Sequence, residues 1–159
     1  MAKEIERKFL VVSEDYKALA SECKRMKQAY LSLRPDSTVR VRISGPNAWL
    51  TIKSRNIGTT RNEWEYPIPV SDAETMIAEC SEGTVISKCR YIVPASYGLR
   101  WEVDEFDGAH AGLCVAEIEL PSPDTDFERP SFIGREVSGD PRYYNSSLAA
   151  DGASTPPRS

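Results

Sequence analysis

A strict alternation of charged and apolar residues, repeated in one segment after another, is the feature that most constrains how this chain folds. The segment TVRVRIS (residues 38–44) places Arg40 and Arg42 on one face of an extended strand and three branched apolar residues on the other. Side chains two residues apart share a face and lie about 6–7 Å from each other. Because an unpaired charge is expensive to bury, such a face must meet solvent, a counter-charge, a metal or an anionic ligand.

The same patterns divide the chain into eight predicted strands and two predicted helices. We predict strands near residues 4–12, 27–33, 38–44, 48–54, 61–70, 85–93, 99–106 and 113–120. Apolar residues at helical spacing predict one helix over Tyr16–Arg25 and another from Ser71 to about Glu82. Ser131–Val137 and Asn145–Ala150 are predicted as short helical turns.

The charged faces of these strands carry acids and bases in blocks. The acids are Glu4, Glu6, Glu63, Glu65, Glu102, Asp104, Glu117 and Glu119. The bases are Lys8, Arg40, Arg42, Lys53, Lys88, Arg90 and Arg100. A single strand of this kind is typical of a solvated outer face. Eight of them favour closure, because a closed sheet has no free edges and turns its charged face into a lumen.

We therefore predict an α+β fold: an eight-stranded antiparallel closed β-barrel with helices packed on the outside. A lumen lined by both signs of charge suits a polyanion together with its metal ion. Carboxylates hold a hard cation, whereas Lys and Arg hold phosphate oxygens.

Composition excludes several other classes of protein. A chain of 159 residues indicates one domain, which we place at residues 1–150, followed by a disordered tail at 151–159. The net charge of −4 argues against a nucleic-acid binder, and from the sequence we expect neither a membrane span nor a signal peptide. Four cysteines without C-x-x-C spacing and one histidine, His110, argue against a zinc site and favour a reducing cytoplasm. His110 lies in a glycine-containing turn and is expected to be exposed.

Nine motifs, in order along nearly the whole chain, carry a resemblance to a known family. They are EIERKFLV, QAYL, VRVR, LTIK, NEWEY, SKCRY, WEVDEF, GLCVAEIEL and IGREVSGDPRYYNSSLA. The first contains an E-x-E-x-K signature, and the set resembles the CYTH superfamily, the triphosphate tunnel metalloenzymes, in its small single-domain bacterial form. Ala29 departs from the glycine that relatives often have, at a position where no ligand is expected.

The resemblance implies a tunnel that binds a triphosphate with one or two divalent metal ions, here Mg²⁺ or Mn²⁺. It implies metal binding by Glu4, Glu6, Asp104, Glu117 and Glu119. It implies phosphate binding by Lys8, Arg40, Arg42, Lys53, Lys88, Arg90 and, in the C-terminal segment, Arg135. The residues that we assign to catalysis are Lys8, Lys88, Glu63 and Glu65.

The function expected from this resemblance is metal-dependent hydrolysis of inorganic tripolyphosphate to diphosphate and phosphate. Three alternatives stay open: a nucleoside or thiamine triphosphatase, a class IV-like adenylate cyclase, and a non-catalytic polyphosphate-binding module. The expected partner is a small triphosphate, with no nucleic acid and no membrane. Whether the protein forms a homodimer is left open.

Overall fold

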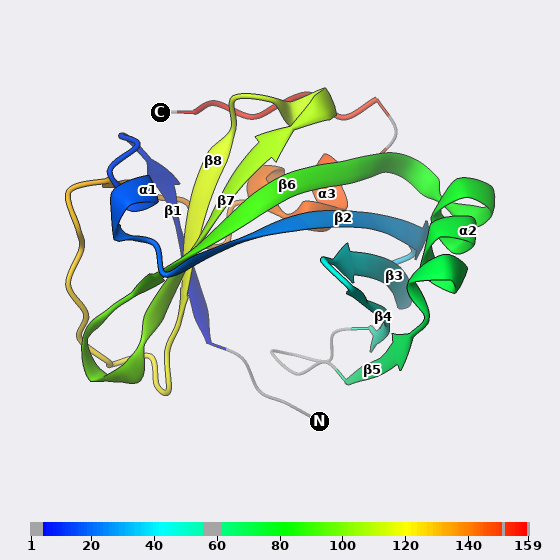
Figure 1. Cartoon of the computed structure of the whole chain (residues 1–159), viewed down its shortest axis with the longest axis horizontal. Coiled ribbons are helices and arrows are strands. Elements are labelled where there is room, and N and C mark those ends of the chain that lie inside the picture. Colours follow the sequence, from blue (N-terminus) through cyan, green and yellow to red (C-terminus); the bar gives the residue numbers. More distant parts are fainter. Residues whose placement is uncertain (1–4, 56–61, 151, 159) are drawn as a thin grey trace.

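The structure, a computed structural model, describes residues 5–55, 62–150 and 152–158. Figure 1 shows these residues as a long, curved antiparallel sheet with a few short helices around it. The strands are β1 (Glu6–Val11), β2 (Glu22–Ser32), β3 (Ser37–Ser44), β4 (Asn47–Ser54), β5 (Glu63–Ile68), β6 (Glu82–Pro94), β7 (Arg100–Asp107), β8 (Cys114–Glu119) and β9 (Ile133–Glu136). The helices are α1 (Tyr16–Leu19), α2 (Val70–Cys80) and α3 (Asn145–Leu148), with 3₁₀ turns η1 (Ser96–Gly98), η2 (Gly108–His110) and η3 (Pro141–Tyr143).

The sheet is open, so the predicted closed eight-stranded barrel is wrong. Within the described residues the strand order is β5-β4-β3-β2-β6-β7-β8-β1-β9, with nine strands and with β5 and β9 at the two edges. Other features of the two edge strands disfavour pairing with a further strand. Edge strand β5 carries Pro67, which cannot donate a backbone hydrogen bond, and the charged Glu63 and Glu65. Edge strand β9 is only four residues long.

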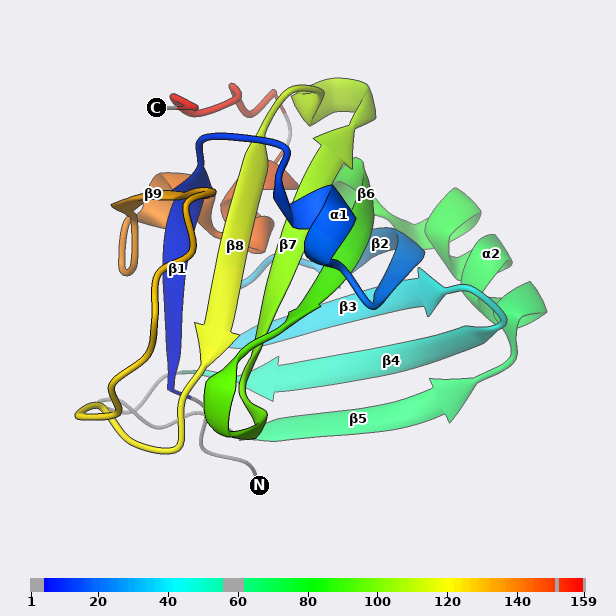
Figure 2. The same ribbon diagram turned by 60° about the vertical axis from the view of Figure 1, so that its left-hand side comes forward.

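The sheet bends strongly between two groups of strands. Figure 2 shows β1, β8 and β7 standing nearly upright, while β3, β4 and β5 run almost across them. The long strands β2, of 11 residues, and β6, of 13 residues, pair with each other and join the two groups. The concave face of this bend carries the charged side chains of the alternating segments.

The convex face of the sheet is apolar and is covered by helices and loops. Under α2, a cluster of buried residues that includes Val41 and Ile77 packs β2, β3 and β4 against the helix. A second cluster forms around Trp101, Phe9 and Phe132, and Tyr16 of α1 joins it. Burying these side chains contributes about 25 cal/mol per Å² of apolar area removed from water. Most of the driving force for folding therefore lies on the face away from the charged residues.

One end of the concave face is also apolar, because the C-terminal segment folds over it. Leu10, Ile86 and Phe106 lie on this face and pack against Tyr143 and Leu148 in a single buried cluster. The concave face is therefore charged along part of its length and plugged at one end by the chain that follows β9.

Two predicted helical segments are partly or largely strand in the structure. The predicted helix Tyr16–Arg25 ends at Leu19, and residues from Glu22 onward belong to β2. Ser131–Val137 contains β9 instead of a helical turn. In both cases pairing with a distant strand outweighs the local pattern: Glu22 pairs with Ile92, and Glu136 pairs with Phe9.

The other predicted elements lie close to their expected positions. The hairpin between β3 and β4 turns through Gly45 and Pro46, and Gly45 has a φ of 57°, a conformation that glycine adopts without strain. No helix among the described residues is both long and apolar enough to cross a membrane. The division into a domain at residues 1–150 and a disordered tail at 151–159 remains a proposal.

Candidate functional site

The bend of the sheet encloses a cavity of about 740 Å³ on its charged concave face. Strands β1 to β8 all contribute to its walls, together with the start of α3 and the loop between β2 and β3. The lining residues are Glu6, Lys8, Tyr30, Leu33, Pro35, Thr38, Arg40, Arg42, Thr51, Lys53, Glu63, Glu65, Arg90, Glu102, Glu117, Glu119, Tyr144, Asn145 and Ser146. Charged side chains that are far apart in the sequence therefore share one enclosed space.

Arginines from the interior strands form a strongly basic wall of this cavity. The Nε of Arg42 donates to Oε1 of Gln28, at 2.9 Å, and no carboxylate of the described residues forms an ion pair with Arg42. Burial, together with the charges of Arg40 and Arg90, lowers the pKa of Arg42 to about 10. The buried Nε of Arg40 has no hydrogen-bond partner within the described part of the chain. This wall therefore carries more positive charge than the protein around it neutralises.

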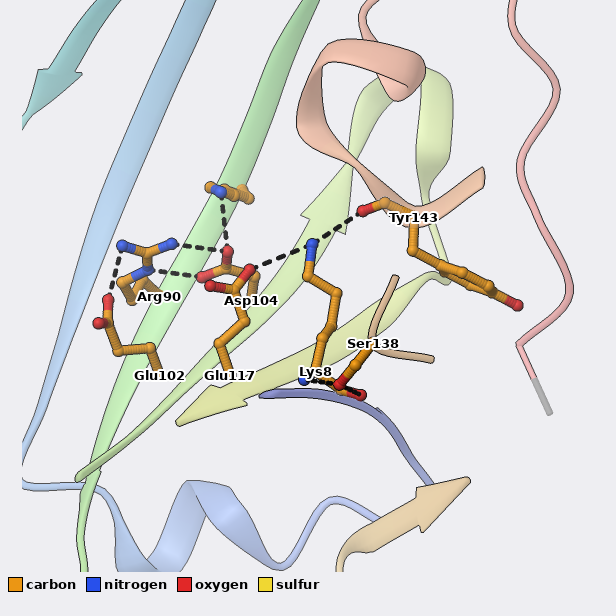
Figure 3. A network of polar contacts seen from close by, with 8 residues as sticks. Lys8, Arg90, Glu102, Asp104, Glu117, Ser138 and Tyr143 are labelled. Atoms are coloured by element: carbon orange, nitrogen blue, oxygen red, sulfur yellow. Dashed lines mark hydrogen bonds and ion pairs between the residues drawn. The ribbon is translucent and has the colours of Figure 1, made fainter. Parts of the chain in front are cut away.

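Carboxylates lie on the strands at both ends of the sheet order. Glu6 of β1 is paired with Glu119 of β8, and Glu117 of β8 is paired with Lys8 on one side and Glu102 on the other. The Nζ of Lys8 lies 3.2 Å from Oε1 of Glu117 and donates to the carbonyl oxygen of Tyr143 at 2.9 Å (Figure 3). One lysine is thus held between a cavity carboxylate and the C-terminal segment.

The opposite edge of the sheet carries a second acidic pair. Oε2 of Glu65 accepts from the Thr51 hydroxyl at 2.9 Å and lies 3.8 Å from Nη2 of Arg40. Glu63 lies 4.0 Å from Nζ of Lys53. Glu65 and Glu63 therefore face bases of the cavity wall. Their distances to Arg40 and Lys53 are long for ion pairs, so these two bases can turn toward a bound anion.

An ion network extends beneath the cavity lining, where its members Lys88 and Asp104 are buried. Oδ2 of Asp104 accepts from Nζ of Lys88 at 2.7 Å. Both Asp104 oxygens also accept from Arg90, at 2.7 and 2.9 Å (Figure 3). Arg90 also reaches Glu102, which lines the cavity, at 2.6 Å. Arg90 is therefore held by the buried Asp104 beneath the lining and by Glu102 within the cavity.

Burial affects the two ends of this network differently. Burial alone raises the pKa of Asp104, but the charges of Lys88 and Arg90 outweigh it and hold that pKa well below its usual range. Burial lowers the pKa of Lys88 to about 8; the charge of Asp104 opposes this shift, and the charges of Arg90 and Arg42 add to it. Within this network the proton on Lys88 is therefore the one that is held most weakly.

The donor set of the cavity fits a hard divalent cation. Glu6, Glu117 and Glu119 supply only oxygen ligands, which Mg²⁺ and Mn²⁺ prefer. Within residues 5–55, 62–150 and 152–158, no three acidic, cysteine or histidine side chains already form a compact metal site. Glu4, the other predicted first-strand ligand, lies outside the described residues. The chemistry of the acids present is therefore suitable, without a ready-made coordination shell.

Comparison with known proteins identifies the family. Residues 2–144 match the sequence profile of the family described as "CYTH domain". The chain belongs to the CYTH family. Among curated relatives, a protein of Acetivibrio thermocellus named inorganic triphosphatase is 46% identical over 148 residues, covering 93% of this chain and 94% of the relative. A protein of Nitrosomonas europaea with the same name is 36% identical, covering 92% of this chain and 96% of the relative.

Solved structures agree with this family assignment. The crystal structure of the inorganic triphosphatase NE1496 superimposes with a TM-score of 0.70 at 34% identity, covering 94% of this chain and 95% of that chain. A structure from Hippeastrum, described as a putative adenylyl cyclase with a dominant triphosphatase activity, has a TM-score of 0.54 at 16% identity and shows likeness of fold alone. This chain therefore shares its overall fold with other solved proteins.

Most of the site residues predicted for this CYTH chain lie together in the cavity. Those that line it are Glu6, Lys8, Arg40, Arg42, Lys53, Glu63, Glu65, Arg90, Glu117 and Glu119. Lys88 and Asp104 lie beneath the lining, where they bind each other. Arg135 is an exposed residue of β9 that does not line the cavity. The structure thus divides the predicted set into residues that reach the cavity and residues that support them.

Several residues at the site were given no role in the sequence analysis. Glu102 was recognised as part of a charged face, but only strand register shows that it lies opposite Glu117 and contacts Arg90. Gln28 is fully buried and orients Arg42, which the QAYL motif alone does not reveal. Tyr144 and Asn145 reach the cavity because α3 folds back over the sheet. No local signal in the sequence marks these residues, since each depends on a partner far along the chain.

Proposed function

We propose that this protein hydrolyses inorganic tripolyphosphate to diphosphate and phosphate with the help of a divalent metal ion. The observation that carries the proposal is the pair of Arg40 and Arg42, whose positive charge faces the cavity without full compensation. A linear triphosphate supplies several negative charges in a row, and arginine can bind phosphate oxygens with two parallel hydrogen bonds. The names of the two curated CYTH relatives support the same substrate.

The basic residues would hold the phosphate chain and neutralise the charge that builds up during hydrolysis. Phosphoryl transfer asks the protein mainly to position the reactants and to stabilise charge. The cavity is lined by Arg40 and Arg42 of β3, Lys53 of β4, Arg90 of β6 and Lys8 of β1. In this proposal Lys8 stabilises the negative charge on the oxygen of the leaving diphosphate. Lys88, which lies beneath the lining, then acts by fixing Arg90 through Asp104.

The acids divide into two groups with different proposed roles. Glu6, Glu117 and Glu119 are the residues that would hold Mg²⁺ or Mn²⁺, with Glu4 as a further candidate outside the described residues. When bound, such an ion supplies Lewis-acid neutralisation of phosphate oxygens. Glu63 and Glu65 would orient the attacking water and the neighbouring bases, since they already lie within 4.0 Å of the Lys53 ammonium and the Arg40 guanidinium, respectively.

A nucleoside triphosphatase is the second candidate, because the cavity continues into a smaller one of about 200 Å³. The continuation shares Arg40 and Arg42 with the main cavity and adds Met26, Ser44 and Trp49. An aromatic ring beside arginines is a surface on which a nucleobase can stack. The same space could instead stay filled with water when the substrate carries no organic group.

The deciding experiment measures phosphate release from tripolyphosphate, ATP and thiamine triphosphate, each with Mg²⁺, with Mn²⁺ and with EDTA. We expect rapid release from tripolyphosphate, little from the other two, and none with EDTA. Faster release from ATP would favour the nucleoside triphosphatase, and cyclic AMP without phosphate release would favour a cyclase. Binding of tripolyphosphate without turnover under either metal would favour a non-catalytic binding module.

A further inference from the structure

His110 is buried, in contrast to the exposed turn residue expected from the sequence. Its exposed fraction is 2%, and both ring nitrogens have partners. Nε2 lies 2.7 Å from the carbonyl oxygen of Leu148, the last residue of α3, and Nδ1 lies 2.9 Å from the hydroxyl of Thr155. Because a carbonyl can only accept, Nε2 must carry the hydrogen, and in the neutral ring Nδ1 accepts from Thr155. The turn between β7 and β8 is therefore bonded to the C-terminal segment at two points.

The bond to Leu148 satisfies one of the carbonyls that every helix leaves without a partner at its C-terminal end. The next carbonyl, that of Ala149, accepts from the backbone N–H of Thr84 in β6 at 2.7 Å. The end of α3 is thus held by one backbone group and by one side chain, His110. Thr155 and the Tyr143 hydroxyl, which donates to the Pro157 carbonyl at 2.5 Å, hold the chain that follows.

The same segment contacts the cavity through its other end. Within α3 the Leu148 N–H bonds to the Tyr144 carbonyl at 2.9 Å, and Tyr144 and Asn145 line the cavity. The adjacent carbonyl, that of Tyr143, accepts from the Lys8 ammonium at 2.9 Å (Figure 3). A continuous series of hydrogen bonds and one helical turn therefore runs from His110 to Lys8.

We propose that His110 is a positioning residue for the reaction: by capping α3 at Leu148, it holds the Tyr143 carbonyl where that carbonyl orients Lys8 beside Glu117. This inference rests on the proposed function, in which Lys8 faces the leaving oxygen. A displacement of about 1 Å in a catalytic group can cost up to about a hundredfold in rate. Loosening α3 at Leu148 is therefore expected to affect turnover although His110 itself never touches the substrate.

The test compares His110→Ala with His110→Gln, whose side-chain N–H₂ replaces the Nε2–H donor to Leu148. We expect His110→Ala to lower kcat about tenfold while the KM for tripolyphosphate changes less than threefold. His110→Gln should recover most of the lost kcat. A control that weakens the fold elsewhere is Ile77→Val, on the buried side of α2 against the convex face, which should lower Tm without lowering kcat.

A double-mutant cycle separates positioning from a general loss of stability. In a Lys8→Met background, His110→Ala should produce no further fall in kcat, whereas the two changes in Tm should add. An additive fall in kcat would overturn the proposal, as would an unchanged kcat in His110→Ala or an equal fall in Ile77→Val.

Hydrogen exchange tests the cap without relying on activity. In His110→Ala the amides of Leu148 and Ala149 should exchange faster, while those of β7 and β8 keep their protection. If the wild-type protein does not hydrolyse tripolyphosphate, the proposed function fails, and this measurement still shows whether His110 holds α3. Unchanged exchange at Leu148 and Ala149 would refute the cap itself.

Discussion

Asp104→Asn is the substitution whose consequences follow most directly from the structure. The change keeps the shape of the side chain but removes the charge that compensates Lys88 and Arg90. Lys88 has an exposed fraction of 0%, and Asp104 is its one ion-pair partner among the described residues. Arg90 keeps Glu102 at 2.6 Å, so Lys88 is the group left with an uncompensated charge.

The expected loss of stability at pH 7 is about 3–4 kcal/mol, from two sources. In the wild-type protein Lys88 is charged, with its pKa at about 8 compared with 10.5 for a free lysine. Without Asp104 it should become neutral, which adds about 1.4 kcal/mol at pH 7, one pH unit below that value. Losing charge-assisted hydrogen bonds to Arg90 adds roughly 1.5–3 kcal/mol. The total agrees with the roughly 3–5 kcal/mol expected for breaking a buried ion pair on one side.

The pH dependence has a definite sign. Between pH 7 and 8 the variant's Lys88 is neutral in the folded state but protonated in the unfolded state, so the unfolded state binds more protons. The free energy of unfolding of the variant therefore rises with pH. That of the wild-type protein changes little until the pH approaches 8, the pKa of its Lys88. Because wild-type Lys88 is itself half deprotonated at pH 8, the difference between the two free energies of unfolding should narrow by about 1 kcal/mol between pH 7 and 8.

Urea denaturation in EDTA at pH 7.0, 7.5, 8.0 and 8.5 measures this difference. A gap below about 1 kcal/mol at pH 7, or one that does not change with pH, would refute the reasoning. The double variant Lys88→Met/Asp104→Asn should regain stability and lose the pH dependence. Asp107→Asn is the matched control: it is on the same strand, is partly exposed and is paired with Arg25, and it should cost less than about 1 kcal/mol.

Two further substitutions test other parts of the structure. Arg42→Met should raise the KM for tripolyphosphate at least tenfold. It should also raise Tm, because it removes a charge that the protein does not compensate. An unchanged KM would contradict the binding role, and Arg25→Met on the convex face is the control. Glu136→Gln should cost about 1 kcal/mol at pH 7, since Arg7 lowers the pKa of Glu136 to about 2. That stability is present above the unfolded pKa of 4.5 and is lost as pH falls toward 2, so urea curves of the two proteins should converge near pH 2–3.

Strand position and facing could be predicted from the sequence because alternation is a local property. Arg40 and Arg42 face the cavity as the pattern of TVRVRIS indicates. The predicted closure failed because alternation reports which face of a strand is buried and says nothing about whether the last strand pairs with the first. The predicted boundary between α1 and β2 was wrong for a related reason: Glu22 to Arg25 pair with residues of β6 that lie more than 60 positions further along the chain.

The candidate site was predictable to the extent that its residues carry charge on alternating strands. Uncharged supports were not predictable. Gln28 of β2 supports Arg42 because the two residues lie opposite each other on neighbouring strands. His110 bonds to Leu148 and Thr155, which follow it by 38 and 45 residues. A single turn with one histidine gives no indication of such partners, so only the folded chain reveals them.

The distribution of charge over the sheet explains how this site can hold like charges close together and still be well ordered. The bases lie mainly on β3, β4 and β6, each of which is hydrogen-bonded to a strand on either side. Their mutual repulsion opposes folding, and the apolar clusters on the convex face offset it. An anion that enters the cavity relieves this repulsion without having to order the arginines first, so little of its binding energy is spent on rearrangement. Folding and triphosphate binding are then linked through the same residues: the charges that weaken the empty protein stabilise the occupied one.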